Sequence, residues 1–167
     1  MHRSLMALIF IVGVSSAYAQ QPPFDCSGSS AHRLFDFWIG EWVVSDAQGT
    51  VQGANSIRLI QNGCALQEQW RGIKGSSGES INYYHPGENK WHQLWVDGGT
   101  SIIDISGGLE KGAMVLRGSI YYLASGNSKS FRGTWTPLPD DRVRQFFEEQ
   151  DEAGLWQTWF EGFYKRK

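Results

Sequence analysis

The sequence predicts an all-β protein that folds as an antiparallel up-and-down barrel of about eight to ten strands. Turn signals rich in glycine, asparagine and aspartate recur about every 8 to 12 residues, a spacing typical of sandwiches and barrels. The chain has 20 glycines and 14% aromatic residues. After the N-terminal segment, no stretch shows a convincing helical period. A closed barrel leaves no free strand edge, and a two-sheet sandwich of the same strands is the alternative.

The expected strands alternate with short segments whose residues tolerate the positive φ angles of tight turns. One helical turn is expected within residues 31–39, ahead of the first strand. Near the C-terminus of the chain, the turn that begins at Asp151 has a single weak similarity to an Asp-box repeat, and we interpret it as a hairpin. The predicted turns are residues 46–49, 61–63, 75–78, 85–89, 97–99, 107–108, 125–127, 137–141 and 151–154.

The N-terminal segment has the pattern of an export signal. Arg3 precedes an apolar run over residues 5–14, and Ala17-Tyr18-Ala19 forms a small-residue cleavage site. The apolar run is too short for a membrane-spanning helix, which needs about 20 residues. We therefore predict a signal peptide over residues 1–19, an N-terminal extension over residues 20–34 and one barrel domain over residues 35–167. The mature protein is expected to be periplasmic or secreted and to begin at Gln20.

The charge pattern argues against polyanionic partners. The formal net charge is −2, and the only basic run is the short C-terminal Lys165-Arg166-Lys167. Nucleic acid and anionic membrane surfaces are therefore poor candidate partners. No second apolar span follows the signal segment, so no stable membrane span is expected. The pattern makes no prediction about oligomeric state.

Cys26 and Cys64 are the two cysteines of the chain. In an oxidising compartment such a pair is most simply a disulfide, which would tie the N-terminal extension to the barrel. A zinc site is a weaker interpretation, because no histidine or further cysteine stands at ligand spacing. We predict the disulfide and no metal site.

Alternation along two strands predicts which side chains face the interior. In residues 142–149 the charged Arg142, Arg144 and Glu148 should face water, which places Val143, Gln145, Phe147 and Glu149 inside. In residues 65–71 the same argument places Gln67, Gln69 and Arg71 outside and Leu66, Glu68 and Trp70 inside. An interior carboxylate must be paired, protonated or hydrated. Without a cavity, Glu149 would lie at the open rim and Glu68 would pair with an inward arginine such as Arg58.

The other strands supply further lining. Residues 113–122 and 130–136 contribute mainly apolar inward side chains, including Trp135. In residues 91–97 either face could point inward, and if the tryptophans do so, Gln93 accompanies Trp95. A flat aromatic wall with a few polar groups is typical of small-molecule sites. The candidate ligand-binding residues are Glu68, Trp70, Gln93, Trp95, Trp135, Gln145 and Phe147.

The opening of the barrel domain resembles a known type of barrel protein. Gly40-Glu41-Trp42 carries the Gly-x-Trp found at the first strand of lipocalins and the wider calycins, where the tryptophan closes one end of the barrel. The longer Phe-Asp-Phe-Trp-x-Gly-Glu-Trp opening at residues 35–42 is similar to a family of exported bacterial lipocalin-like proteins. Similar blocks lie at residues 83–86, 91–97, 133–140, 142–145 and 156–167. The resemblance implies the barrel fold and a buried Trp42, but it implies no activity.

Motifs of cofactor-dependent or nucleophilic chemistry are missing from the sequence. No Gly-x-Ser-x-Gly elbow, phosphate loop or dinucleotide fingerprint occurs. Nitrobindin-like barrels bind haem through a histidine near their C-terminal strands, and this chain has no histidine after His92. We therefore predict no cofactor. His85 and His92 flank a turn and could form a two-ligand metal site, although solvated side chains are the simpler interpretation.

The sequence is compatible with three functions. The first is an exported carrier or sensor that binds a small, partly apolar molecule inside the barrel. The second is an envelope interaction or structural module whose core is filled. The third is a hydrolase or isomerase that uses Glu68 or Glu149 as acid and base. An open interior would favour the first function, and a filled interior would exclude it.

Overall fold

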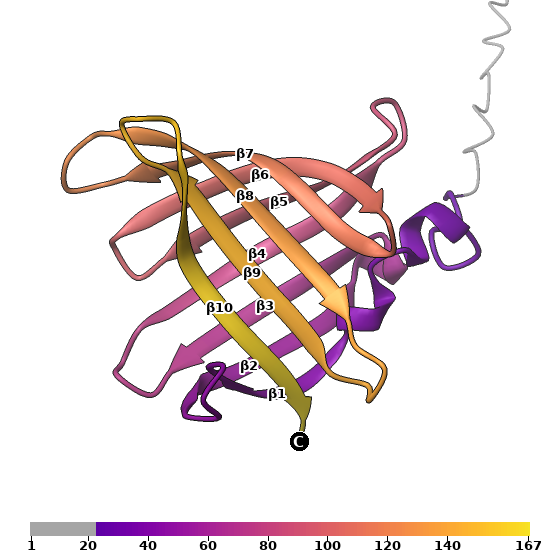
Figure 1. The fold of residues 1–167 in the computed structure, drawn as a ribbon. Helices are drawn as coiled ribbons and strands as arrows, with labels where there is room; N and C mark the ends of the chain where they lie inside the picture. Colours follow the sequence, from indigo (N-terminus) through magenta and orange to yellow (C-terminus); the bar gives the residue numbers. More distant parts are fainter. Residues whose placement is uncertain (1–22) are drawn as a thin grey trace, which may run out of the picture.

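The computed structural model describes residues 23–167 and shows ten strands in one closed barrel (Figure 1). Three short 3-10 segments accompany them: η1 (Ser30–Arg33), η2 (Asp36–Trp38) and η3 (Gln61–Gly63). The predicted signal peptide and its cleavage site lie outside the described residues. The strands are β1 (Gly40–Ser45), β2 (Val51–Ile60), β3 (Ala65–Gly72), β4 (Ser77–His85), β5 (Lys90–Asp97), β6 (Ser101–Glu110), β7 (Ala113–Tyr122), β8 (Ser128–Pro137), β9 (Val143–Gln150) and β10 (Trp156–Arg166).

Every strand pairs antiparallel with its neighbours in the sequence, and β1 closes the barrel against β10. The predicted up-and-down barrel is confirmed, and the sandwich alternative is wrong. One predicted turn is also wrong, because Gly107 and Gly108 lie within β6. The β6–β7 hairpin turns instead at Lys111 and Gly112, whose φ angles are positive. A Cβ at Gly107 would overlap the backbone oxygen of Val115, so this glycine serves a close strand approach.

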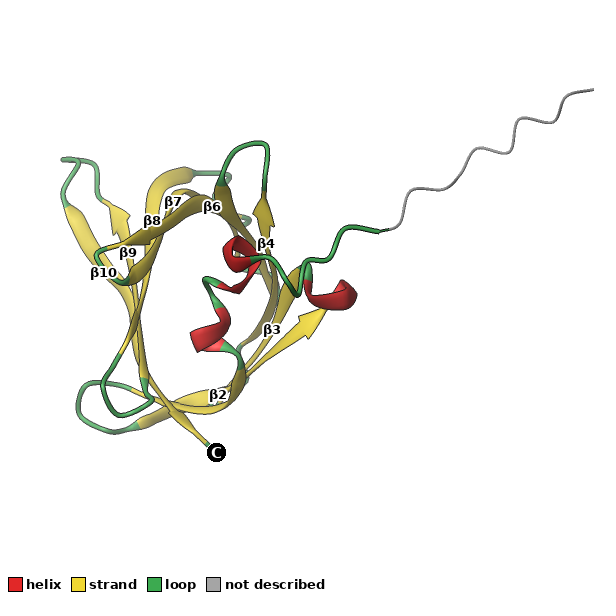
Figure 2. Ribbon diagram, turned by 90° about the vertical axis from the view of Figure 1, so that its right-hand side faces the viewer, coloured by secondary structure: helices red, strands yellow, loops and turns green. Residues whose placement is uncertain are grey.

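An aromatic plug fills one end of the barrel. Segments η1 and η2 lie across that opening when the barrel is viewed along its axis (Figure 2). Phe35 stacks on Trp38 with ring centroids 5.0 Å apart, and its ring also meets Trp91 and Trp135 edge-on. All four side chains are buried. The predicted helical turn before the first strand is thus two 3-10 segments that complete the core.

Trp42 closes this end beneath the plug. Its ring nitrogen donates a hydrogen bond to the Trp38 carbonyl oxygen over 2.9 Å, and the side chain is fully buried. The Arg166 guanidinium covers the ring at 4.3 Å from its centroid. Gly40 precedes this tryptophan with a φ of 151°, a conformation that favours glycine. The expected burial of Trp42 at one end of the barrel is confirmed.

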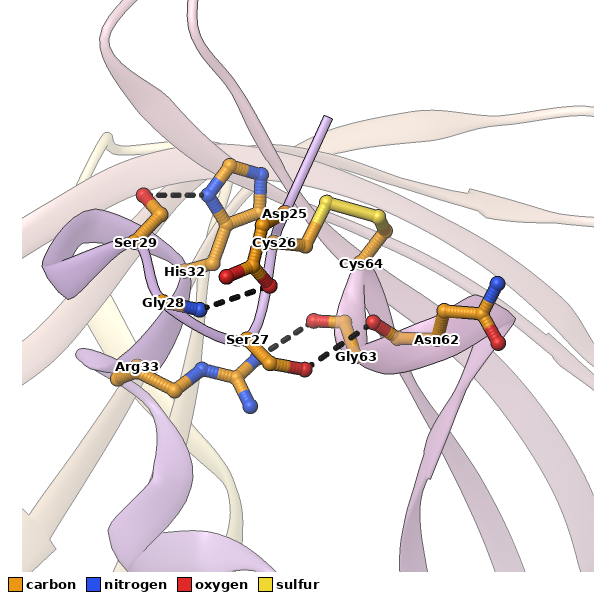
Figure 3. Close-up of a disulfide and its surroundings, with 10 residues drawn as sticks. All are labelled: Asp25, Cys26, Ser27, Gly28, Ser29, His32, Arg33, Asn62, Gly63 and Cys64. Atoms are coloured by element: carbon orange, nitrogen blue, oxygen red, sulfur yellow. Dashed lines mark hydrogen bonds between the residues drawn. A yellow bond between two sulfur atoms is a disulfide. The ribbon is translucent and has the colours of Figure 1, made fainter. Parts of the chain in front are cut away.

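The predicted disulfide joins Cys26 to Cys64, across 38 residues of sequence (Figure 3). It attaches the N-terminal extension to the η3 connection between β2 and β3. Two further bonds support the same junction: Ser27 donates to the Asn62 carbonyl oxygen and Arg33 donates to that of Gly63. The disulfide therefore holds the segment that leads into the plug.

A repeated hairpin motif borders the opposite end of the barrel. Asp46 and Asp151 each begin a turn and accept amide hydrogens from the residues two and four positions later. The second carboxylate oxygen of each aspartate accepts an amide hydrogen from a glutamine six positions on, Gln52 or Gln157. The pattern Asp-x-x-Gly-x-x-Gln therefore occurs twice, and the turn at Asp151 is a hairpin as expected.

No helix among residues 23–167 is long and apolar enough to cross a membrane.

Removing the disulfide should loosen the plugged end. We expect a Cys26→Ser, Cys64→Ser double variant to lose about 2–5 kcal/mol of unfolding free energy, the usual range for a native disulfide in a small secreted domain. Urea unfolding monitored by tryptophan fluorescence would measure the loss. Ser27→Ala removes one exposed hydrogen bond from the same junction and should cost much less. An unchanged denaturation midpoint in the double variant would contradict this role.

Candidate functional site

The barrel end opposite the plug contains a cavity of about 440 Å³. Its mouth is bordered by residues of the β3–β4 and β5–β6 hairpins, including Ile73, Lys74, Asp97 and Thr100. Its walls are mainly apolar, and its deeper surface is polar. The wall residues are Trp70, Trp95, Ile103, Phe147, Trp159 and Phe160, and the deeper polar residues are Glu68, Gln145 and Tyr164.

Inward glycines leave room for two of the wall tryptophans. A Cβ at Gly53 would lie 2.6 Å from Cη2 of Trp70, and a Cβ at Gly78 would overlap the ring of Trp95. The two rings thus lie flat over neighbouring backbone instead of projecting across the barrel. Glycine at these positions keeps the cavity open.

Glu68 forms the centre of the polar floor and is only 3% exposed. One carboxylate oxygen accepts a hydrogen bond from the Asn55 amide over 2.7 Å. The other oxygen accepts one from the Ser80 hydroxyl, also over 2.7 Å. Register explains this meeting, because Glu68 on β3 pairs directly with Ser80 on β4 and lies diagonally across from Asn55 on β2. The carboxyl group is therefore held by neutral donors alone.

The hydrogen bonds continue from Glu68 along the inner wall in both directions. Asn82 donates to the Ser80 hydroxyl over 2.8 Å, and Gln93 donates to the Asn82 amide oxygen over 2.9 Å. These side chains lie on β4 and β5.

On the other side, the Asn55 amide also donates to the Tyr164 hydroxyl over 3.1 Å, and that hydroxyl donates to the Gln145 amide oxygen. Together these hydrogen-bonded side chains form a polar belt between the plugged half and the open half of the barrel. The belt consists of Gln93, Asn82, Ser80, Glu68, Asn55, Tyr164 and Gln145.

The environment of Glu68 favours its neutral form. Burial raises the pKa of the Glu68 carboxyl to about 7, although the hydrogen bonds from Ser80 and Asn55 oppose the shift. Burial and the nearby Glu68 charge raise the pKa of the Tyr164 hydroxyl well above its usual value, so this phenol stays neutral. Glu68 consequently changes charge near neutral pH.

The structure brings Glu68, Trp70, Trp95, Gln145 and Phe147 together around the cavity. It also settles the face of residues 91–97, because Trp91 and Gln93 are buried. Two other candidate residues point inward but do not line the cavity. Gln93 is part of the polar belt, and Trp135 packs against Phe35 and Trp38 in the plugged half.

The expectation that Glu68 pairs with Arg58 is wrong. Arg58 lies outside the barrel and donates to the amide oxygens of Gln67 and Gln69. Along β2, the Arg58 side chain points to the face opposite to that of Asn55 and Ile57, whose side chains are buried. The partner of Glu68 from β2 is therefore Asn55.

Glu149 lies near the rim of the barrel, away from the cavity lining. Lys129 pairs with its carboxylate over 2.6 Å, and the Tyr122 hydroxyl donates to it. Burial opposes its ionisation, but the hydrogen bonds from Lys129 and Tyr122 and the lysine charge hold the Glu149 pKa below its usual value. Glu68 and Glu149 are not brought together in one site.

Alternation along β10 would not place both of its wall residues on the inner face, because the strand contains a bulge. The register between β9 and β10 shifts between Thr158 and Phe160. A bulge redirects neighbouring side chains, and both Trp159 and Phe160 line the cavity. Trp159 is fixed there by a 3.1 Å hydrogen bond to the Tyr122 hydroxyl. Ser80, Asn55 and Tyr164 lie on β4, β2 and β10, whose inward faces the sequence pattern does not reveal.

The two histidines beside the β4–β5 turn, His85 and His92, lie next to Glu88. His92 lies 3.2 Å from a Glu88 carboxylate oxygen, and His85 lies 3.9 Å from the other. No group of three or more metal-ligating side chains suited to an ion occurs within residues 23–167.

No protein-family model matches this chain, and no curated protein matches it. The resemblance to exported lipocalin-like proteins stays a prediction.

Glu68 should make stability fall as the pH rises. An acid whose folded-state pKa is raised stabilises the fold at low pH, and this contribution is lost between the unfolded-state pKa of 4.5 and the folded-state value of about 7. That shift corresponds to roughly 3 kcal/mol. We expect Glu68→Gln to remove this slope in urea unfolding measured from pH 4.5 to 8.

Glu79→Gln is the control, because it changes an exposed carboxyl group on the outer face. The unfolding free energy of Glu79→Gln should change with pH as that of the wild type does. An identical pH dependence in wild type and Glu68→Gln would show that Glu68 is not a buried titrating group.

Proposed function

We propose that this protein is an exported carrier or sensor that binds a small, partly apolar molecule in the open half of its barrel. The observation that carries the proposal is the cavity of about 440 Å³, with aromatic walls and a floor of hydrogen-bonding groups. Small-molecule sites commonly have volumes of about 300–1,000 Å³ and combine apolar walls with a few placed polar groups. The ligand therefore has an apolar body and at least one polar group.

The polar floor is suited to orient a ligand. Gln145 borders the cavity and its amide oxygen is occupied by the Tyr164 hydroxyl. Its amide nitrogen has no hydrogen-bond acceptor among the described residues and is free to donate to a ligand. Glu68 and Gln145 together offer an acceptor and a donor at the deep end of an apolar pocket.

Export is supported by two independent features. Residues 1–19 have the pattern of a signal peptide. The Cys26–Cys64 disulfide suits an oxidising compartment, such as the periplasm or the exterior of the cell. Both the signal-peptide pattern and the disulfide are consistent with a carrier or sensor outside the cytoplasm.

The competing functions receive less support. A structural module needs a filled core, and a cavity of about 440 Å³ lies in the half of this barrel opposite the plug. An acid–base enzyme needs two matched groups at the site, and Glu149 is held by Lys129 outside the cavity lining. Binding without chemistry is the function that the geometry favours.

Binding of the neutral fluorophore N-phenyl-1-naphthylamine tests the proposal. We expect its fluorescence to rise as it enters the cavity, and Trp95→Ala to weaken its binding by roughly 2- to 12-fold, since an aromatic pair contributes about 0.5–1.5 kcal/mol. Leu94→Ala is the matched control, because this neighbouring side chain is exposed on the outer face. Wild-type protein that leaves the fluorescence unchanged, or equal losses in both variants, would contradict a ligand site in the barrel.

A further inference from the structure

We propose that the cavity selects cationic ligands, namely protonated amines with an aromatic or aliphatic body, and that the ammonium group pairs with Glu68. This inference rests on the proposed function and names the ligand class of the same site. It follows from the charge, the hydrogen-bonding capacity and the walls of the cavity.

Ionised Glu68 is an unbalanced buried charge. Ionised Glu68 has only neutral hydrogen-bond partners, and no ion pair within residues 23–167 includes it. A buried carboxylate without a cation is costly. The groups around it are Asn55 and Ser80 on the adjoining strands and Tyr164 and Gln145 on β10 and β9, none of which carries a positive charge. A ligand cation would supply the missing counter-charge.

The Glu68 carboxylate also has unused hydrogen-bonding capacity. Each carboxylate oxygen can accept about two hydrogen bonds. Each Glu68 oxygen accepts one from the described residues, from Asn55 or from Ser80. Glu68 also borders the cavity. An ammonium group with its three N–H donors could therefore bind Glu68 without displacing either neighbour.

The cavity walls also suit a cationic ligand. Trp70, Trp95 and Phe147 line the cavity. Aromatic faces attract cations as well as apolar surface, and tryptophan does so most strongly. The walls thus suit both the body of an aryl or alkyl amine and its charged end.

Charges at the mouth do not reverse this preference. Lys74 and Asp97 are the charged residues that border the cavity besides Glu68. Lys74 is exposed to solvent. The Asp97 carboxylate accepts hydrogen bonds from the backbone of its own turn and from the Ser101 hydroxyl. Glu68 is the only titratable carboxyl group at the buried floor among the lining residues.

The pairing implies a pH dependence. Because the Glu68 pKa is about 7, the cavity floor is largely neutral at pH 5.5 and negatively charged at pH 8.5. Alkyl amines titrate near about 10 and stay protonated over this range. Amine binding should therefore strengthen as the pH rises, whereas a ligand carboxylate should bind more weakly.

Three probes with the same indole body separate charge from shape: tryptamine as the cation, 3-ethylindole as the neutral molecule and indole-3-propionate as the anion. Their Kd values would be measured by displacement of N-phenyl-1-naphthylamine and by isothermal titration calorimetry. At pH 8.5 we expect tryptamine to bind at least about tenfold more tightly than 3-ethylindole, as is usual for a hydrogen bond to a charged group. Indole-3-propionate should bind most weakly. Lowering the pH to 5.5 should reduce the preference for the amine.

Glu68→Gln should abolish the preference for tryptamine over 3-ethylindole. Glu79→Gln is the matched control, because it neutralises an exposed carboxylate on the outer face of β4, and it should keep the preference. If 3-ethylindole binds as tightly as tryptamine in wild type, the cation inference is overturned and the proposed function stands. Retention of the preference in Glu68→Gln would also overturn the inference. If neither the indoles nor the fluorophore binds, the inference and the proposed function both fall.

Discussion

Ten strands closed into a barrel enclose more space than their own side chains readily fill, and the rest of the structure depends on this constraint. At one end the space is filled by a segment that precedes the first strand. Phe35, just before η2, and Trp38, at its end, enter the barrel and pack against Trp91 and Trp135. The Cys26–Cys64 disulfide attaches the chain before this segment to the β2–β3 connection. Because no corresponding segment within residues 23–167 enters the other end, the cavity remains there.

The polar belt lies where the two halves meet. Polar side chains inside a barrel need partners, and those of β2 to β5, β9 and β10 hydrogen-bond to one another through Glu68 and Tyr164. Two amide oxygens of the belt, Asn55 Oδ1 and Gln93 Oε1, have no hydrogen-bond partner among the described residues. Glu68 has hydrogen-bond donors but no cation. That imbalance gives the cavity a chemical preference as well as a shape, and the wall tryptophans over Gly53 and Gly78 keep the floor accessible.

The sequence allowed the strand number, the antiparallel order, the disulfide and the inward faces of β3 and β9 to be predicted. These features depend on local signals: turn residues, cysteine pairing and a period of two. Alternation distinguishes inside from outside but gives no position along the barrel axis. It therefore grouped Trp135, which lies in the plug, with Trp95, which lies at the cavity.

Other features depended on non-local geometry. The bulge near Trp159 has no sequence signature of its own, and it brings two adjacent aromatic residues to the cavity. Glu68 bonds to Asn55 and not to Arg58 because the register and the inward face of β2 bring Asn55 beside it. The Gly107-Gly108 pair looked like a turn, although it allows β6 and β7 to approach closely.

The most direct test of this account is the pKa of Glu68 itself, measured in the free protein by ¹³C NMR titration of the side-chain carboxyl carbon. The account predicts a midpoint of about 7, because the carboxyl is buried among neutral groups at the floor of the cavity. A midpoint near the ordinary value of 4.5 would contradict it. Such a value would mean that Glu68 is hydrated or already paired with a cation, and the cavity would then lack its defining charge.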